Sequence, residues 1–110
     1  MITDIVPEEE FRKKLAFWLL DNDSSAVLPQ GMSREEYASE YILPDFEFEH
    51  TQSSSDPQGN IITLLKSCVE LSDWETKKGK KAKLTFYRVM KTFASSPDSE
   101  PYPMGYIIVE

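Results

Sequence analysis

The sequence predicts an α+β fold in which N-terminal helices pack on a C-terminal antiparallel sheet. Two features of the first half predict the helices: apolar residues recur at helical spacing after Pro7, and a helix-capping sequence begins at Ser33. The second half has apolar runs rich in strand-forming residues, and the terminal GYIIV over 105–109 predicts a last strand bounded by Pro101 and Pro103.

The alternative is a mostly helical fold with a two-stranded sheet. The runs Ile61–Leu71 and Lys83–Phe93 decide between the two folds, because each fits either a strand or a helix with one apolar stripe. Two helices there would leave a sheet of only two strands, which is marginally stable. We therefore favour strands in both runs, joined by an exposed hairpin tip over Trp74–Lys81.

The first helix is expected over Glu8–Leu20. Pro7 suits the start of a helix, and the glutamates at 8–10 suit the positive end of its dipole. One stripe of the helix is apolar and contains Phe11, Leu15, Trp18 and Leu19.

A second helix is expected over Arg34–Ile42. Ser33 and Glu36 have the spacing of a capping box, and Pro44 disfavours helical geometry in the residue before it. A strand is expected next over Asp45–His50, where two phenylalanines alternate with three acids, followed by a polar loop over Thr51–Gln58.

The length and charge of the chain narrow its function. Its 110 residues are expected to form one domain, 1–110, with a net charge of −7. Lys77–Phe93 holds seven basic residues and no acid, so the rest of the chain carries about −14. This charge makes nucleic acid and anionic membrane unlikely partners and favours a protein with a basic surface. The single cysteine and the absence of targeting or membrane segments favour a cytoplasmic location.

Exposed acids and aromatics are the candidate protein-binding residues. An acidic patch speeds the encounter with a basic partner, and an exposed Trp or Tyr is a frequent interface anchor. The simpler interpretation of the acids is an ordinary solvated face. The candidates are Glu35, Glu36, Glu40, Asp45, Glu47, Glu49, Trp74 and Tyr102.

The basic segment is the alternative site, for an anion such as phosphate or nucleic acid. Its simpler interpretation is a solvated hairpin tip whose charge keeps the sheet edges apart. Its residues are Lys77, Lys78, Lys80, Lys81, Lys83 and Arg88. The sequence predicts no catalytic residues, no cofactor and no metal site, because it lacks the motifs that mark them.

The sequence thus favours a small, non-enzymatic domain that binds a protein, as inhibitors, immunity proteins and assembly chaperones do. A homodimer is also compatible with the segregated charges. A second hypothesis is a cup-shaped domain or enzyme with an apolar pocket lined by Phe46, Phe48, Phe86, Val89 and Tyr106. A third is a nucleic-acid accessory protein that uses residues 77–91.

Overall fold

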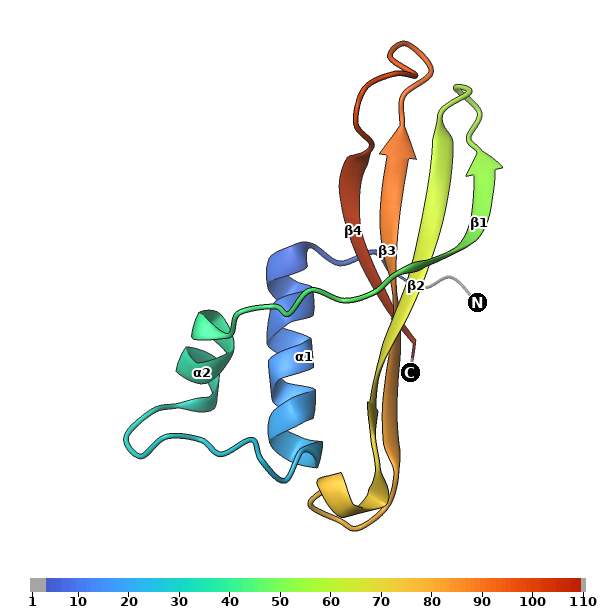
Figure 1. Cartoon of the computed structure of the whole chain (residues 1–110). Helices are drawn as coiled ribbons and strands as arrows, with labels where there is room; N and C mark the ends of the chain where they lie inside the picture. Colours follow the sequence, from blue (N-terminus) through green and yellow to red (C-terminus); the bar gives the residue numbers. More distant parts are fainter. Residues whose placement is uncertain (1–3, 110) are drawn as a thin grey trace.

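A computed structural model describes residues 4–109 and shows two N-terminal helices against a four-stranded antiparallel sheet (Figure 1). The strands follow one another in the order β1-β2-β3-β4. The elements are α1 (Glu8–Asn22), α2 (Arg34–Glu40), β1 (Glu49–Ser55), β2 (Ile61–Leu71), a 3-10 turn η1 (Asp73–Glu75), β3 (Ala82–Thr92) and β4 (Tyr102–Val109). The predicted α+β fold is confirmed, and the helical alternative for the second half is wrong.

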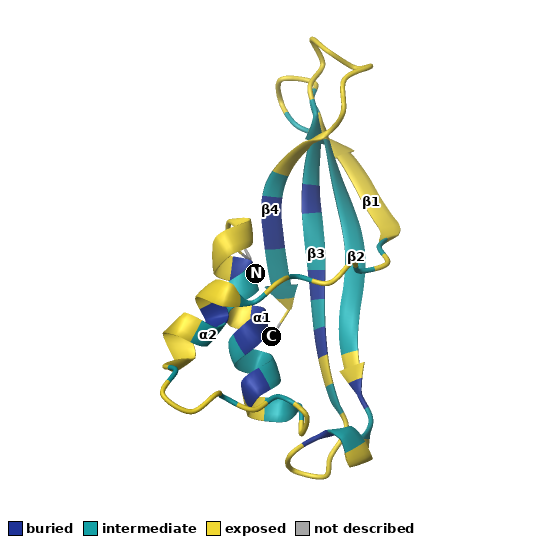
Figure 2. Cartoon of the chain, turned by 60° about the vertical axis from the view of Figure 1, so that its left-hand side comes forward, coloured by how far each residue is buried: buried dark blue, intermediate teal, exposed yellow. Residues whose placement is uncertain are grey.

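The helices cover only part of the sheet. The molecule is elongated, about 50 × 28 × 26 Å, and α1 lies against the half of the sheet that ends in the β2–β3 hairpin. The other half reaches beyond the helices (Figure 1). Most of the buried residues lie on α1, β3 and β4 (Figure 2), whereas β1 is exposed along its whole length.

Aromatic rings fill the space between α1 and the sheet. Phe11 of α1 stacks on Tyr106 with ring centroids 4.1 Å apart and lies 4.8 Å from Phe86. Phe46 and Phe48 pack against the same cluster. Four of the residues proposed above as a pocket lining, Phe46, Phe48, Phe86 and Tyr106, therefore belong to this aromatic cluster or pack against it. Phe11 is the residue that fills it, and its side chain is fully buried.

Both predicted helices are present, with shifted ends. α1 continues to Asn22, whose side-chain amide donates a hydrogen bond to the Trp18 carbonyl (2.9 Å). The Ser33 hydroxyl accepts the Glu36 N–H at the start of α2, as the capping sequence predicts (3.1 Å). α2 ends at Glu40 rather than at 42, because the next residue is already extended.

The strand predicted over Asp45–His50 is mostly wrong. Residues 45–48 are extended without a strand partner, and β1 begins at Glu49 and runs through the predicted polar loop to Ser55. Backbone pairing with β2, rather than side-chain burial, defines this strand, and every residue of β1 is exposed. A strand without buried apolar residues cannot be predicted from the pattern of apolar residues in the sequence.

The last strand is longer than predicted. β4 begins at Tyr102, so Pro103 lies inside it instead of before it. The register shifts between Val89 and Met90 at this point, and β4 is the last strand of the sheet, where a missing N–H is tolerated. The predicted connection between β2 and β3 is confirmed, although it includes η1 and the buried Thr76.

Candidate functional site

Strand β2 has two neighbours along its first half and one along its second. β1 pairs with it from Ser55 opposite Ile61 to Glu49 opposite Lys66. Beyond Lys66, β2 continues to Leu71 and pairs with β3 alone. We call the side of residues 67–71 that faces away from β3 the open edge.

Two hydrogen bonds show which residues of β2 direct their N–H and C=O groups toward β1 and which toward β3. The Asp56 N–H donates to the Asn60 carbonyl across the β1–β2 turn (2.9 Å), and the Thr51 hydroxyl of β1 donates to the Leu64 carbonyl (3.0 Å). The carbonyls of these even-numbered residues therefore point toward β1. Successive residues of a strand point their N–H and C=O groups to opposite sides.

Cys68 and Glu70 consequently direct their N–H and C=O groups to the open edge. Ser67 and Val69 direct theirs to β3, with which they pair opposite Phe86 and Leu84. Within residues 4–109, no strand pairs with β2 at the open edge. A row of unpaired backbone groups of this kind is a template for another strand.

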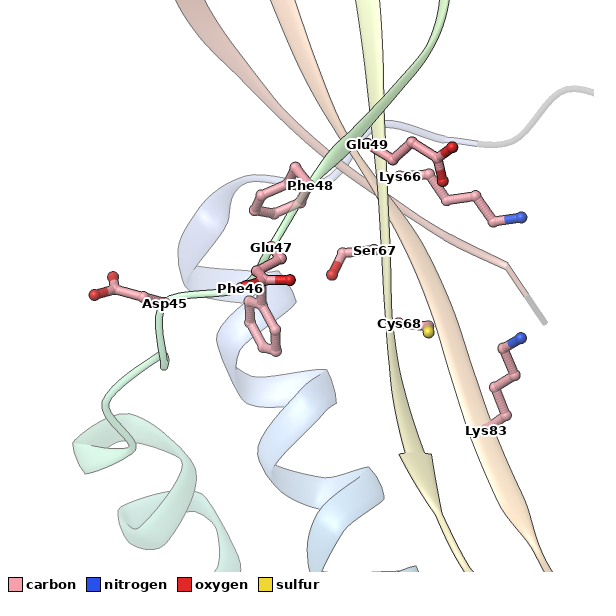
Figure 3. Close-up of a pocket in the computed structure, with 9 residues that line it drawn as sticks. All are labelled: Asp45, Phe46, Glu47, Phe48, Glu49, Lys66, Ser67, Cys68 and Lys83. Atoms are coloured by element: carbon pink, nitrogen blue, oxygen red, sulfur yellow. The ribbon is translucent and has the colours of Figure 1, made fainter.

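An acidic segment, residues 45–48, passes the open edge without pairing to it. Phe46 and Phe48 hold the segment on the helix side, with ring centroids 4.9 and 6.1 Å from that of Phe86. An open groove of about 670 Å³ lies between the segment and β2 (Figure 3). Its lining residues are Asp45, Phe46, Glu47, Phe48, Glu49, Lys66, Ser67, Cys68 and Lys83.

The two sides of the groove differ in charge. In Figure 3, Glu47 and Ser67 point toward one another on the helix side, and Asp45 points away from the groove. Lys66 and Lys83 extend on the opposite face of β2. Among the described residues, no basic group lies within ion-pair distance of Asp45 or Glu47, and of these two carboxylates that of Glu47 is the one on the groove side.

The far side of β2 carries balanced charges. Lys83 contacts Glu70 at 3.2 Å. Lys66 lies opposite Glu49 in the β1–β2 register, and cross-strand partners project from the same face. The half-buried thiol of Cys68 lies between these pairs, 3.9 Å from the Glu70 carboxylate.

The remaining predicted protein-binding residues lie elsewhere. The acids of α2, Glu35, Glu36 and Glu40, are separated from the sheet by α1 (Figure 1). Trp74 is 78% exposed in η1, at one end of the molecule, and Tyr102 is 57% exposed at the start of β4, toward the other end. Tyr102 also packs against Phe93, with ring centroids 6.1 Å apart. The structure therefore brings together Asp45, Glu47 and Glu49, and it does not join them to the other five.

The predicted anion-binding residues also separate. Lys77 fastens the hairpin tip to the end of α1, because its N–H donates to the Asn22 carbonyl (2.8 Å) and its ammonium group to the Leu20 carbonyl. Arg88 lies away from the tip, with its guanidinium 4.4 Å from the Phe48 ring centroid and bonded to the Tyr106 hydroxyl (3.0 Å). The lysines that remain together at the exposed tip are Lys78, Lys80 and Lys81.

The open edge is the feature that the sequence did not reveal. A signal existed in the lengths of the hairpin strands, since β2 has 11 residues and β1 only 7. That difference becomes visible only when β1 is placed correctly, and the apolar pattern placed it too early. Among the described residues, no group of His, Cys, Asp and Glu is arranged to hold a metal ion.

Two further findings bear on function. Within residues 4–109, neither helix has the length and apolar character needed to cross a membrane. Comparison with protein-family models, curated proteins and solved structures finds no match to this chain.

Proposed function

We propose that this protein is a non-enzymatic domain that binds a basic segment of another protein in the groove beside β2. The observation that carries the proposal is the unpaired carboxylate of Glu47, which points toward Ser67 beside a strand edge that has no partner among the described residues. The groove is already open, so binding needs no rearrangement of the core.

Electrostatics supports the proposal. The chain carries a net charge of −7, and Glu47 adds a negative charge on the helix-side wall of the groove, where a partner would dock. Complementary charge steers encounter and sets specificity, and its effect falls as salt screens it. Binding is therefore expected to weaken at high ionic strength.

The test compares two charge reversals in partner capture from a native lysate. The double variant Asp45→Lys and Glu47→Lys reverses the charge of the acidic segment 45–48, including the groove-facing Glu47. Glu35→Lys with Glu40→Lys makes the same charge change on α2, across α1 from the sheet. We expect the groove variant to lose a stoichiometric partner that the α2 variant and the unmodified protein retain at low salt. Equal capture by both variants, or no partner at any salt, would contradict the proposal.

A further inference from the structure

We infer that the partner binds by adding an extended strand to the open edge of β2, where it pairs with the backbone of Cys68 and Glu70. This inference rests on the proposed function, because it names how a protein segment occupies the same groove. The proposed function needs only attraction between charged side chains. The inference adds main-chain hydrogen bonds between the partner and β2.

The open edge already presents the backbone donors and acceptors that an added strand needs. The N–H and C=O groups of Cys68 and Glu70 point toward the groove, spaced two residues apart as in any ladder. A strand placed there would continue the sheet and satisfy these groups. The β3 side is unaffected, because β3 pairs with Ser67 and Val69 through their other edge.

Residues 45–48, which pass beside this position, do not occupy it for a physical reason. Phe46 and Phe48 are part of the aromatic core and hold residues 45–48 on the helix side of the sheet. The segment joins the sheet only at Glu49, where its pairing with Lys66 begins. Residues 45–48 therefore do not supply the closing strand, and we assign it to the partner.

The opposite edge of the sheet shows that an edge can be closed from within the chain. At β4, the Val6 N–H donates to the Tyr106 carbonyl (2.8 Å), and the Tyr106 N–H donates to the Val6 carbonyl (2.9 Å). The N-terminal segment thus covers the β4 edge at Tyr106, in the row that contains Arg88 and Leu65. The open edge of β2 has no such cover within the described residues.

The charges around the groove define the chemistry of the added strand. Its side chains alternate between two faces, one toward the negative helix-side wall with Glu47 and one toward Cys68. The surface that the second face contacts carries two lysines and two glutamates, whose charges cancel. The matching strand has Lys or Arg at every second position and small or β-branched residues between, over about five residues.

The direct experiment uses a peptide of this chemistry, the acetylated and amidated VKVKVKV. It is titrated into the ¹⁵N-labelled protein and followed by NMR. We expect saturable shifts centred on the amides of Cys68 and Glu70, and no binding of VEVEVEV, which has the same strand propensity and the opposite charge. No binding of VKVKVKV, or shifts centred elsewhere, would overturn the inference.

Backbone methylation of the peptide separates strand addition from charge attraction. In an added strand, the N–H groups of alternate residues face β2, so they belong to either the lysines or the valines, and not to both. We expect N-methylation of one set to weaken binding at least about tenfold, and N-methylation of the other set to leave it unchanged. Equal effects of both sets, or no effect of either, would exclude pairing at the edge.

A change in the protein tests the same point from the other side. Cys68→Pro removes an N–H that faces the groove and that β3 does not use, whereas Cys68→Ser keeps it. We expect Cys68→Pro to weaken VKVKVKV binding about tenfold and Cys68→Ser to leave it unchanged. If Cys68→Pro does not fold, binding of the N-methylated peptides to the unmodified protein tests strand addition instead.

The two proposals fail in different ways. If the reversal at Asp45 and Glu47 abolishes partner capture while Cys68→Pro and both methylated peptides bind normally, the acidic groove stands and strand addition is wrong. If both charge reversals capture the partner equally, the proposed function itself is wrong.

Discussion

The two halves of β2 share one strand and one partner in β3, yet they have opposite surroundings. The half from Ile61 to Lys66 pairs with β1, an exposed polar strand, and most of it reaches beyond the helices. The half from Ser67 to Leu71 lies where α1 supports the sheet and has an open edge beside an acidic groove. The supported half is the one that is left unpaired.

This difference indicates where the molecule can accept a partner. A strand added to the half that reaches beyond the helices would meet the polar backbone of β1, which already occupies that edge. A strand added to the supported half meets a preformed edge on a rigid core. The half that contains the core is thus also the half that we propose for binding. The predictions below separate the two halves, from the largest effect to the smallest.

Truncation of the aromatic core is expected to have the largest effect. Phe11→Ala removes a fully buried ring that contacts Tyr106 and Phe86, and it should lower the free energy of unfolding by about 3–5 kcal/mol. Phe93→Ala makes the same truncation outside the supported half, where the ring is 40% exposed, and should cost less than about 1 kcal/mol. Urea unfolding of both variants measures the difference, and similar losses would mean that α1 does not support the core.

Closure of the β4 edge depends on Gly105. Its φ of 140° disfavours other residues, and a Cβ there would collide with the Val6 carbonyl. Gly105→Ala should therefore cost about 1–3 kcal/mol and break the pairing with Tyr106. Chemical denaturation measures the loss of stability, and the exchange rate of the Val6 amide measures the loss of pairing. A variant with unchanged stability and exchange would show that Gly105 is not required for the pairing of Val6 with Tyr106.

A substitution at Asp56, in the turn between β1 and β2, should have the smallest effect on stability, and that effect should depend on pH. The Asn60 side-chain hydrogen bond is the main cause of a lowered pKa at Asp56, and two backbone N–H groups and Lys91 act in the same direction. A carboxyl whose pKa is lower in the folded protein stabilises it above the pKa of the unfolded chain. That stabilisation is lost as the pH falls through the folded value.

Thermal unfolding at several pH values checks this sign. Asp56→Ala should melt a few degrees below the unmodified protein at neutral pH, and the gap should narrow on acidification below pH ~4. A gap that widens as the pH falls would mean that the carboxylate does not stabilise the turn.

Much of the fold could be predicted from the sequence, because it rests on local signals. The acids after Pro7, the Ser33 cap and the density of strand formers over 61–71 each act within a few residues. β1 could not be placed in this way, since its polar residues are held by pairing with β2, and the two phenylalanines before it are held by the core.

The candidate site was predicted in part. The alternation of acids with Phe46 and Phe48 gave Asp45, Glu47 and Glu49 as binding residues, and these line the groove. The sequence could not reveal the backbone groups of Cys68 and Glu70, because a free strand edge depends on where the neighbouring strand ends. Nor could it separate Arg88 from the lysines of the tip, since that separation depends on the direction of β3.

Amide hydrogen exchange along β2, measured by NMR on the free protein, tests the open edge most directly. The amides of Ser67 and Val69, which face β3, and that of Leu64, which faces β1, should be protected. Those of Cys68 and Glu70 should exchange roughly tenfold faster or more. Protection of Cys68 and Glu70 equal to that of Leu64 would show that the edge is already paired, and would contradict its role as the binding site.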